Sequence, residues 1–413
     1  MEELNKLKHL YIGQRTTLDE AHQAVLRSCQ GAVWFHAASV GEFEQARPII
    51  ERLVESQTSK VKGERLPIVV TFFSPSGYEA RKNYPQADGV FYLPLPTRRN
   101  AKKFLDALQP KMAIFVKYEF WPAFLKELKK RAIPTYSICA IFREKQYMFH
   151  WWGAWMLKVL RCFTHIFVQD EASKTLLNAH GIEACSVAGD TRFDRMMAVR
   201  QERLQHTAQT NRFTPIAAFV EGCEQVIVAG STWPKDEILL ERYMNKCRQL
   251  SANGQQPKLI LVPHEIDEAH LHFIFNLFKG RMVRYSNVQA TKDSIRHILH
   301  QANVLVVDAM GLLSSIYPYG QVAYIGGGFG VGIHNTIEAA AYGKPVLFGP
   351  NYHHFREAKG LIEAGAARSI SNYAELESAL DDALNHYIEQ GAKAALYVQS
   401  ELGTTERIFK EIF

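Results

Sequence analysis

The sequence lacks the patterns that define several common protein classes. Its six cysteines are scattered singly over 413 residues and form no C-x-x-C pair. This spacing is typical of a reducing compartment and argues against a zinc ribbon or a disulfide framework. A membrane span needs about 20 consecutive apolar residues, but the longest uncharged run, 309–337, contains seven glycines. The first 15 residues hold no apolar signal core. We expect a soluble, cytoplasmic protein that is at most attached to a membrane surface.

The histidines do not form a metal-binding motif. His264 and His270 miss the H-E-x-x-H spacing, because the second histidine comes six residues after the first. His353 and His354 have no carboxylate at ligand spacing, so solvated or hydrogen-bonded imidazoles are the better interpretation. We predict no metal site and no cofactor.

The charge is distributed unevenly. The whole chain carries a formal charge of +6, but residues 1–200 hold 29 Lys and Arg against 20 Asp and Glu, a net of +9. The remaining 213 residues have a net charge of −3. The N-terminal half is therefore suited to an anionic surface or substrate. With 47% hydrophobic and 22% charged residues, the chain is of ordinary globular composition and not disordered.

Short apolar runs alternate with helical patterns. Strands are predicted at 32–36, 66–72, 112–116, 166–169, 225–229, 258–262, 304–308, 322–325 and 345–348. This alternation predicts an α/β fold with mainly parallel, helix-covered sheets. The rhythm breaks over a polar stretch, so we expect an N-terminal domain at 1–195, a linker at 196–222 and a C-terminal domain at 223–413. The last helix could pack back on the N-terminal domain. Two such domains facing one another would form a ligand-binding cleft.

The segment 34–42, Trp-Phe-His-Ala-Ala-Ser-Val-Gly-Glu, is the first candidate site. A strand ends in a turn of small residues, and a helix opens on Glu42. The helix dipole would hold Glu42 ionised, and an ionised carboxylate at a cleft can accept a proton from an attacking hydroxyl. The alternative is a glutamate that only stabilises the first turn of its helix.

Two glycine-containing turns are candidate anion sites. The run 326–332 holds five glycines in seven residues and leads into Glu338, which could accept hydrogen bonds from ribose hydroxyls. It does not fit G-x-G-x-x-G, so a dinucleotide fingerprint is not predicted. Near 229–237, Ser231 or Thr232 would cap the following helix or bind a phosphate. A purely structural turn is the alternative at both places.

A basic stretch precedes an aromatic run. Ten Lys or Arg and three acidic residues lie in 98–131, and 147–157 reads Tyr-Met-Phe-His-Trp-Trp-Gly-Ala-Trp-Met-Leu. Basic residues beside an exposed aromatic helix suit an anionic membrane surface. A solvated basic face beside a core helix is the alternative, and no nucleic-acid motif is present.

Eight segments in order along the chain resemble the 3-deoxy-D-manno-octulosonate (Kdo) transferases of lipopolysaccharide synthesis. They lie at 36–42, 71–78, 117–122, 188–194, 229–233, 307–311, 326–338 and 348–352. The style is similar to members of the Bacteroides-type lineage. The resemblance implies a GT-B fold with two Rossmann-like domains, CMP-Kdo as donor and a phosphorylated lipid A precursor (lipid IVA) as acceptor. It implies inversion in one displacement, without a metal, at the cytoplasmic face of the inner membrane, with peripheral attachment.

The resemblance also implies roles for individual residues. The catalytic positions are Glu42, as general base, and Glu119. The donor-binding positions are Gly230, Ser231, Thr232, His264, Met310, Gly311, Gly328, His334, Asn335 and Glu338. The acceptor-binding positions are Ser39, Gly41, Ser74, Ser76 and Lys117.

The chain departs from the family pattern at several positions. His264 and Leu312 stand where many members carry Arg and Glu, so an arginine and a carboxylate near the nucleotide are missing, and Pro96 stands where Asp is common. Family members usually begin with a longer apolar anchor, so the chain is either truncated or held by surface contacts. Two other functions stay open: a GT-B enzyme that uses a UDP-sugar, and a non-catalytic nucleotide-sugar-binding protein.

Overall fold

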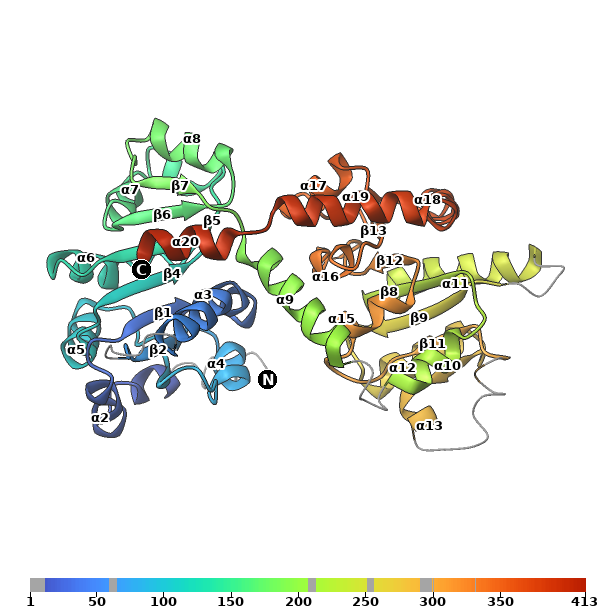
Figure 1. Cartoon of the computed structure of the whole chain (residues 1–413), viewed down its shortest axis with the longest axis horizontal. Helices are drawn as coiled ribbons and strands as arrows, with labels where there is room; N and C mark the ends of the chain where they lie inside the picture. The colour runs from blue at the N-terminus through green and yellow to red at the C-terminus, as the bar shows by residue number, and fades with distance from the viewer. Residues whose placement is uncertain are drawn as a thin grey trace. The chain divides into compact units, whose positions relative to one another are not determined.

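Two sheets made entirely of parallel strands organise the chain (Figure 1). The computed structural model describes residues 12–58, 65–206, 213–250, 256–289, 299, 301–330 and 332–413. These divide into two compact units, Met1–Arg195 with Glu401–Phe413, and Met196–Ser400.

The first unit contains a seven-stranded sheet with β1 near its centre. In spatial order its strands are β3 (Gly89–Tyr92), β2 (Ile68–Phe72), β1 (Val33–Ala37), β4 (Met112–Val116), β5 (Thr135–Ala140), β6 (His165–Val168) and β7 (Cys185–Val187). All five residues of β1 and of β2 are buried, as expected for parallel strands covered on both faces.

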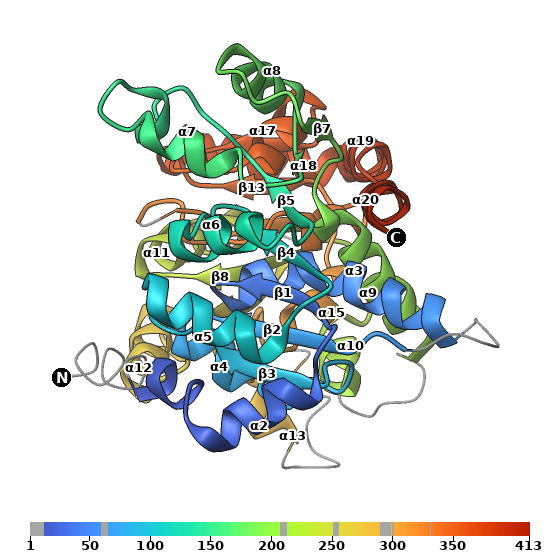
Figure 2. The same ribbon diagram turned by 90° about the vertical axis from the view of Figure 1, so that its left-hand side faces the viewer.

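Helices cover both faces of this sheet and form two core layers (Figure 2). One layer is contributed by α2 (Glu20–Ser28), α5 (Arg98–Leu108), α6 (Pro122–Lys130), α7 (Trp155–Leu160) and α8 (Glu171–Ala179). The other is contributed mainly by α3 (Val40–Thr58) and α20 (Thr404–Ile412). The short α4 (Pro75–Arg81) follows β2, and its N-terminus is capped by Ser74.

The second unit contains another seven-stranded parallel sheet. In spatial order its strands are β10 (Met282–Arg284), β11 (Val304–Val306), β9 (Lys258–Pro263), β8 (Val226–Thr232), β12 (Val322–Ile325), β13 (Val346–Phe348) and β14 (Ala367–Ser369). Its helices are α10 (Thr214–Val220), α11 (Pro234–Leu250), α12 (Glu268–Leu277), α13 (Tyr285–Gln289), α15 (Leu313–Ile316), α16 (Ile337–Ala340), α17 (Arg356–Glu363), α18 (Tyr373–Asn385) and α19 (Tyr387–Ser400).

The predicted α/β architecture is confirmed, and each of the nine predicted strands is present. Five further strands, β3, β5, β7, β10 and β14, were not predicted. Four of them are only three or four residues long, and β5 alternates polar with apolar residues. Pairing with a buried neighbour forms these strands, and a single sequence carries little signal for that.

Helix α9 (Thr191–His206) runs through the predicted end of the first domain. Residues 196–222, predicted as a linker, contain the rest of α9 and α10 and are grouped with the second unit. The last helix, α20, is grouped with the first unit, where it packs beside α3 (Figure 1).

Asp194 ties α20 to the start of α9. Gly403, at the N-cap of α20, has no side chain to satisfy the first amides of the helix. Asp194 replaces that cap: its carboxylate accepts hydrogen bonds from Gly403 N (2.8 Å), Thr405 N (2.6 Å) and Thr405 Oγ1 (2.7 Å). A carboxylate is also favoured there by the helix dipole.

Asp194→Ala should therefore destabilise the first unit by about 2 to 4 kcal/mol, because three hydrogen bonds to a charged acceptor are lost. The measurement is the urea midpoint, together with proteolysis within 401–413. Asp170→Ala is the matched control, since Asp170 caps α8 through one bond, to Ser173 N, and should cost about 1 kcal/mol. Equal losses in the two variants would contradict the assignment.

Candidate active site and donor site

The candidate catalytic residues follow three adjacent strands of the first sheet. The order β2-β1-β4 brings together the loops after Phe72, Ala37 and Val116. After β1 the chain adds β2 and then β3 on one side of it, and then crosses back to add β4 on the other side. The strand order therefore reverses between β1 and β4, and ligands bind at such topological switch points in open α/β sheets. Glu42 and Glu119 come from the two loops that flank this point.

The carboxylate of Glu42 is held by one oxygen. Its Oε2 accepts a hydrogen bond from Ala38 N (2.6 Å), while Glu42 N donates to Ser39 Oγ (3.4 Å). This arrangement resembles a capping box and stabilises the start of α3. Within the described ranges, Glu42 Oε1 has no hydrogen-bond partner. One oxygen therefore anchors the side chain, and the other is available for a proton.

The surroundings of Glu42 raise its pKa above the usual value. Burial is the largest cause and the negative charge of Glu119 is the next, while the Ala38 amide, Lys117 and His36 act in the opposite direction. A carboxylate with a raised pKa is a stronger base than an exposed one, which suits a general base near neutral pH. The sequence led us to expect a carboxylate held ionised by the helix dipole, and it could not show that burial and a second carboxylate raise the pKa of Glu42.

Glu119 lies in a buried polar network. Its Oε2 is 3.0 Å from His36 Nε2 and accepts a hydrogen bond from Trp121 Nε1 (2.7 Å). On the other side of the imidazole, His36 Nδ1 lies 3.1 Å from Thr71 O and 2.9 Å from Thr71 Oγ1. Sequence patterns could not identify Thr71 and Trp121 as partners, because Thr71 lies in β2 and Trp121 in the loop after β4.

The five acceptor-site residues lie at the same end of the sheet. Ser39 and Gly41 follow β1, Ser74 and Ser76 follow β2, and Lys117 follows β4. Ser74 N donates to Ala38 O (2.8 Å), which joins the first two loops. Ser74 is also occupied as the cap of α4, since its Oγ accepts from Gly77 N. Ser76 is exposed and Lys117 is half-exposed, with a left-handed backbone (φ 54°).

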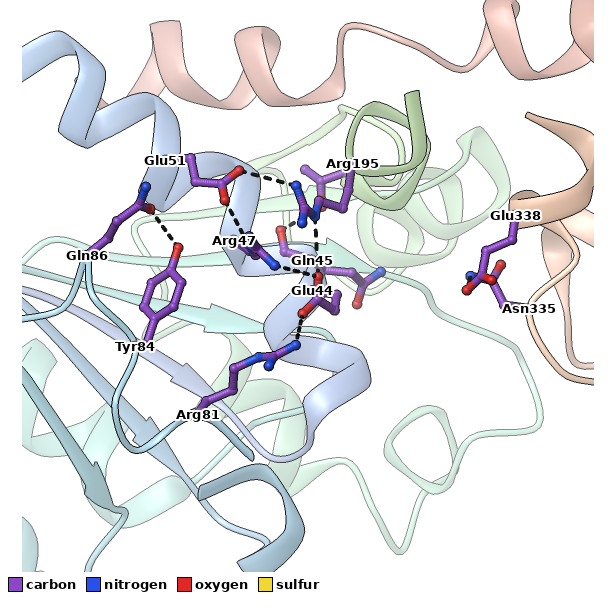
Figure 3. Close-up of polar contacts among 11 residues, drawn as sticks. Glu44, Gln45, Arg47, Glu51, Arg81, Tyr84, Gln86, Arg195, Asn335 and Glu338 are labelled. Carbon is purple, nitrogen blue, oxygen red and sulfur yellow. Dashed lines mark hydrogen bonds and ion pairs between the residues drawn. The ribbon is translucent and has the colours of Figure 1, made fainter. Parts of the chain in front are cut away.

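A charged cluster on α3 follows Glu42 along the chain (Figure 3). Glu44 pairs with Arg81 (2.7 Å) and Arg195 (3.4 Å), and Glu51 pairs with Arg47 (2.7 Å). These pairs connect α3 with α4 and with the start of α9. The cluster supports the element that presents Glu42.

The candidate donor residues also follow adjacent strands. In the order β11-β9-β8-β12, Met310 and Gly311 follow β11, His264 follows β9, and Gly230, Ser231 and Thr232 end β8. Gly328, His334, Asn335 and Glu338 follow β12. Parallel strands thus bring all ten predicted residues to one edge of the second sheet.

Several of these residues have a structural task. Thr232 is fully buried, and its hydroxyl donates to Glu237 (2.9 Å), so it does not cap α11 with its side chain. A Cβ on Gly230 would lie 2.5 Å from the Tyr317 hydroxyl, and one on Gly328 would lie 2.6 Å from the Gly349 backbone. Close packing therefore requires glycine at 230 and 328.

The glycine turn is tied to β8 and α11 by Asp236. The buried carboxylate accepts from Gly327 N (3.0 Å), Trp233 N (2.9 Å) and the Tyr324 hydroxyl (2.7 Å). Beside it is a cavity of about 320 Å³, whose lining includes Trp233 and Phe329. The helix after the turn, α16, has only four residues, so its dipole contributes little to the binding of an anion there.

Asn335 and Glu338 lie side by side (Figure 3). Asn335 Nδ2 donates to Glu338 Oε1 (3.1 Å), and Asn335 Oδ1 accepts from Ile337 N (3.0 Å). Both side chains are partly exposed. This orients a carboxylate and an amide as a matched pair of acceptor and donor.

Three aromatic rings stack at the ends of β8, β9 and β12. The ring centroids of Trp233 and His264 are 4.9 Å apart, and those of His264 and His334 are 4.4 Å apart. Burial, together with the neighbouring His264, lowers the pKa of His334. Met310 is 73% exposed. The stack was not predicted, because its members are far apart in the sequence.

The described ranges hold no group of three or more His, Cys, Asp or Glu side chains arranged to bind a metal ion. They also hold no helix that combines the length and apolar character needed to cross a membrane.

Comparison with solved structures defines the class of fold. The UDP-GlcNAc 2-epimerase of Neisseria meningitidis, solved with UDP-GlcNAc, superposes with a TM-score of 0.64 at 16% identity, covering 92% of this chain and 98% of that one. A UDP-forming α,α-trehalose-phosphate synthase from Burkholderia vietnamiensis gives a TM-score of 0.50 at 11% identity, covering 92% and 98%. The fold is that of the GT-B class.

Sequence comparison shows which proteins the chain is similar to. Residues 11–195 match the family model of the 3-deoxy-D-manno-octulosonic-acid transferases (Kdo transferases). The 3-deoxy-D-manno-octulosonic acid transferase of Aquifex aeolicus is 26% identical over 87% of this chain and 88% of its own length. That of Haemophilus influenzae is 27% identical over 86% and 79%. The first unit of the chain thus matches the Kdo transferase family model, and the relatives that are similar over most of the chain are named Kdo transferases.

The raised pKa of Glu42 has a consequence for stability. A carboxyl group with a raised pKa in the folded state contributes stability below its unfolded pKa, and loses it as the pH rises through the folded value. In Glu42→Gln the side chain keeps an oxygen for the Ala38 amide, but the amide group does not ionise. The variant should therefore gain stability relative to wild type between about pH 4 and neutral pH. The measurement is Tm across this range.

The control for this comparison is Glu171→Gln, an exposed glutamate in the first turn of α8. A difference in Tm between Glu42→Gln and wild type that stays constant across this pH range would contradict a raised pKa for Glu42.

Proposed function

We propose that this enzyme transfers Kdo from CMP-Kdo to a hydroxyl group of a lipid A precursor, with Glu42 as general base. The observation that carries the proposal is the carboxylate of Glu42, anchored through Oε2, with a free Oε1 and a raised pKa. The family model that residues 11–195 match and the names of the relatives support Kdo as the sugar, and CMP-Kdo as the donor rests on the resemblance of the sequence motifs.

The proposed reaction is a single displacement with inversion. The acceptor hydroxyl oxygen attacks the anomeric carbon of Kdo, its proton passes to Glu42, and the bond from that carbon to the phosphate oxygen breaks. CMP leaves with the electron pair. The leaving group is a nucleoside monophosphate, so its charge is smaller than that of a diphosphate and side chains can hold it without a metal.

The donor is assigned to the strand ends of the second unit. Asn335 and Glu338 suit ribose hydroxyls, since their paired amide and carboxylate offer a donor and acceptors. Ser231 and the stacked His264 and His334 are assigned to the anionic part of CMP-Kdo. An imidazole N–H can donate a hydrogen bond to an anion, and His264 would replace the arginine that the chain lacks there. Thr232, Gly230 and Gly328 support this site by packing.

Glu42→Gln should lower turnover by roughly 10² to 10⁴-fold, because the base is lost. Donor binding should hardly change, since Glu42 lies in the other unit. The assay mixes CMP-Kdo generated in situ with a tetra-acylated lipid A precursor, with and without EDTA, and separately measures CMP binding.

Glu171→Gln is again the matched control and should keep wild-type turnover. An active Glu42→Gln enzyme would exclude Glu42 as base. Binding of UDP-sugars without any binding of CMP would show that the donor is a UDP-sugar and not CMP-Kdo. Loss of product in EDTA would contradict the metal-independent route.

We also propose that the first unit attaches peripherally to an anionic membrane, at the cytoplasmic face of the inner membrane, where a lipid acceptor resides. Trp151, Trp152 and Trp155 are 90%, 56% and 52% exposed, in and just before α7, which projects from this unit (Figure 2). Lys129 Nζ donates to Arg161 O (2.7 Å), so the basic end of α6 lies beside α7. Exposed tryptophans next to lysines suit a lipid headgroup region.

Replacing Trp151 and Trp155 with serine should weaken binding to phosphatidylglycerol vesicles by roughly tenfold or more, because buried aromatic area is lost. Binding of wild type should also fall with salt. Sedimentation with vesicles measures both. Ile388→Ser, an equally exposed apolar residue on α19, is the control and should bind as wild type. Unchanged binding of the double variant would exclude this surface.

A further inference from the structure

Lys117 is a positive side chain at the same edge of the first sheet as Glu42. His36 of β1 is paired with Phe115 of β4, so Ala38 and Lys117 each follow two residues later where these neighbouring strands end. Ala38 N is the group that holds the Glu42 carboxylate. Burial raises the pKa of Glu42 most, and the charge of Lys117 is among those that oppose this, as a nearby cation does. The register and the electrostatics thus both place Lys117 beside Glu42.

The ammonium group of Lys117 has no partner among the residues that the structure describes, although two carboxylates are near. The second carboxylate is that of the buried Asp190, whose pKa is raised by burial but lowered to about 2 by Arg192 and, more weakly, by Gln45 and Lys117. Asp190 accepts hydrogen bonds from Gln45 Nε2 (2.8 Å) and Arg192 N (3.0 Å), and it pairs with the Arg192 guanidinium (2.7 Å). Both of its oxygens therefore have their own donors, and Lys117 remains available for an anion from outside.

The backbone of Lys117 is left-handed (φ 54°), which is uncommon for a residue with a long side chain. Lys117 N donates to Ile138 O (2.9 Å), so the ladder between β4 and β5 continues to this residue. The chain then turns back, and Glu119 N donates to Val116 O (3.4 Å). Glycine would adopt this conformation without strain. A lysine at this turn therefore indicates that the side chain has a task of its own.

The chemistry of the proposed donor supplies an anion at this place. Kdo is an ulosonic acid, so its carboxylate is bonded directly to the anomeric carbon. In the proposed reaction the acceptor oxygen attacks that carbon while Glu42 takes its proton, and the Kdo carboxylate must then come within a few ångström of Glu42. Two negative groups at such a distance repel one another unless a positive charge lies beside them. The phosphates of a lipid acceptor are not bonded to the reacting carbon, so the reaction itself does not bring them here.

We propose that Lys117 binds the carboxylate of the Kdo group of the donor, and not the acceptor to which the family resemblance assigns it. The ammonium group donates a charge-assisted hydrogen bond to this carboxylate, offsets its repulsion with Glu42 and orients the anomeric carbon toward the acceptor hydroxyl. The inference deepens the proposed function and rests on it, since it takes Glu42 as the base and Kdo as the transferred sugar.

The first experiment compares the KM values of both substrates in Lys117→Met and wild type. Methionine has a similar length and the same Cβ, so the left-handed backbone is no more strained than before. KM for CMP-Kdo should rise roughly 10- to 100-fold, as expected for the loss of one charge-assisted hydrogen bond. KM for the acceptor and inhibition by CMP, which has no carboxylate, should stay within about twofold of wild type. Because Lys117 also lowers the pKa of Glu42, rates are compared on the plateau of each pH profile.

Lys111→Met is the matched control, because Lys111 is exposed and lies just before β4, at the opposite edge of the sheet. This variant should keep wild-type KM values. Lys117→Arg retains the charge and should recover most of the loss in donor KM. A rise in the acceptor KM without a rise in the donor KM would overturn the proposal, and so would equal changes in both KM values, which a merely structural role predicts.

The second experiment needs neither the acceptor nor transfer. It measures the binding of CMP-Kdo and of its carboxamide, in which an uncharged amide replaces the carboxylate of Kdo. Wild type should bind CMP-Kdo roughly 10- to 100-fold more tightly than the carboxamide, and Lys117→Met should bind both about equally. The same preference in the two enzymes would overturn the proposal. Absence of Kdo transfer by wild type would instead reject the proposed function, and the binding preference would still decide whether Lys117 holds the carboxylate.

Discussion

The common direction of the strands is the constraint on which both sites depend. In each unit seven strands run in parallel, so all their carboxyl ends meet at one edge of the sheet. The strands are buried on both faces and can carry few polar groups there. Polar side chains are therefore concentrated in the loops that leave this edge. Glu42 and Glu119 become neighbours although 76 residues separate them in sequence, because β1 and β4 pair directly.

The negative charges of Glu42 and Glu119 repel one another, and each carboxylate is stabilised by different neighbours. Glu42 keeps one oxygen on the Ala38 amide and stays beside Lys117. Glu119 receives the Trp121 indole and faces His36. The first arrangement leaves Oε1 of Glu42 without a partner among the described residues, and the second engages Oε2 of Glu119 with His36 and Trp121. Under the proposed function, this difference in environment, rather than residue type, separates the base from a supporting carboxylate.

The sequence predicted most of the fold but only part of the site. Apolar runs such as 112–116 and 322–325 coincide with β4 and β12, because a strand buried on both faces leaves a continuous apolar signal. The three-residue strands β7, β10 and β14 leave almost none. Spacing also led to Glu42, since a small-residue turn precedes it. It could not show that Trp121 meets Glu119 or that Trp233, His264 and His334 stack, because those contacts depend on strand order.

The division of residues between two folded units has a consequence for the chemistry. Glu42, His36 and Glu119 belong to the first unit, and Ser231, His264, Asn335 and Glu338 belong to the second. Each set belongs to its own sheet, so substitutions in one should act on base strength and those in the other on donor affinity. A transfer reaction that needs both sets would couple them through the bound substrates. Non-additive effects of Glu42 and Glu338 variants on kcat, with additive effects on CMP affinity, would be the signature of that coupling.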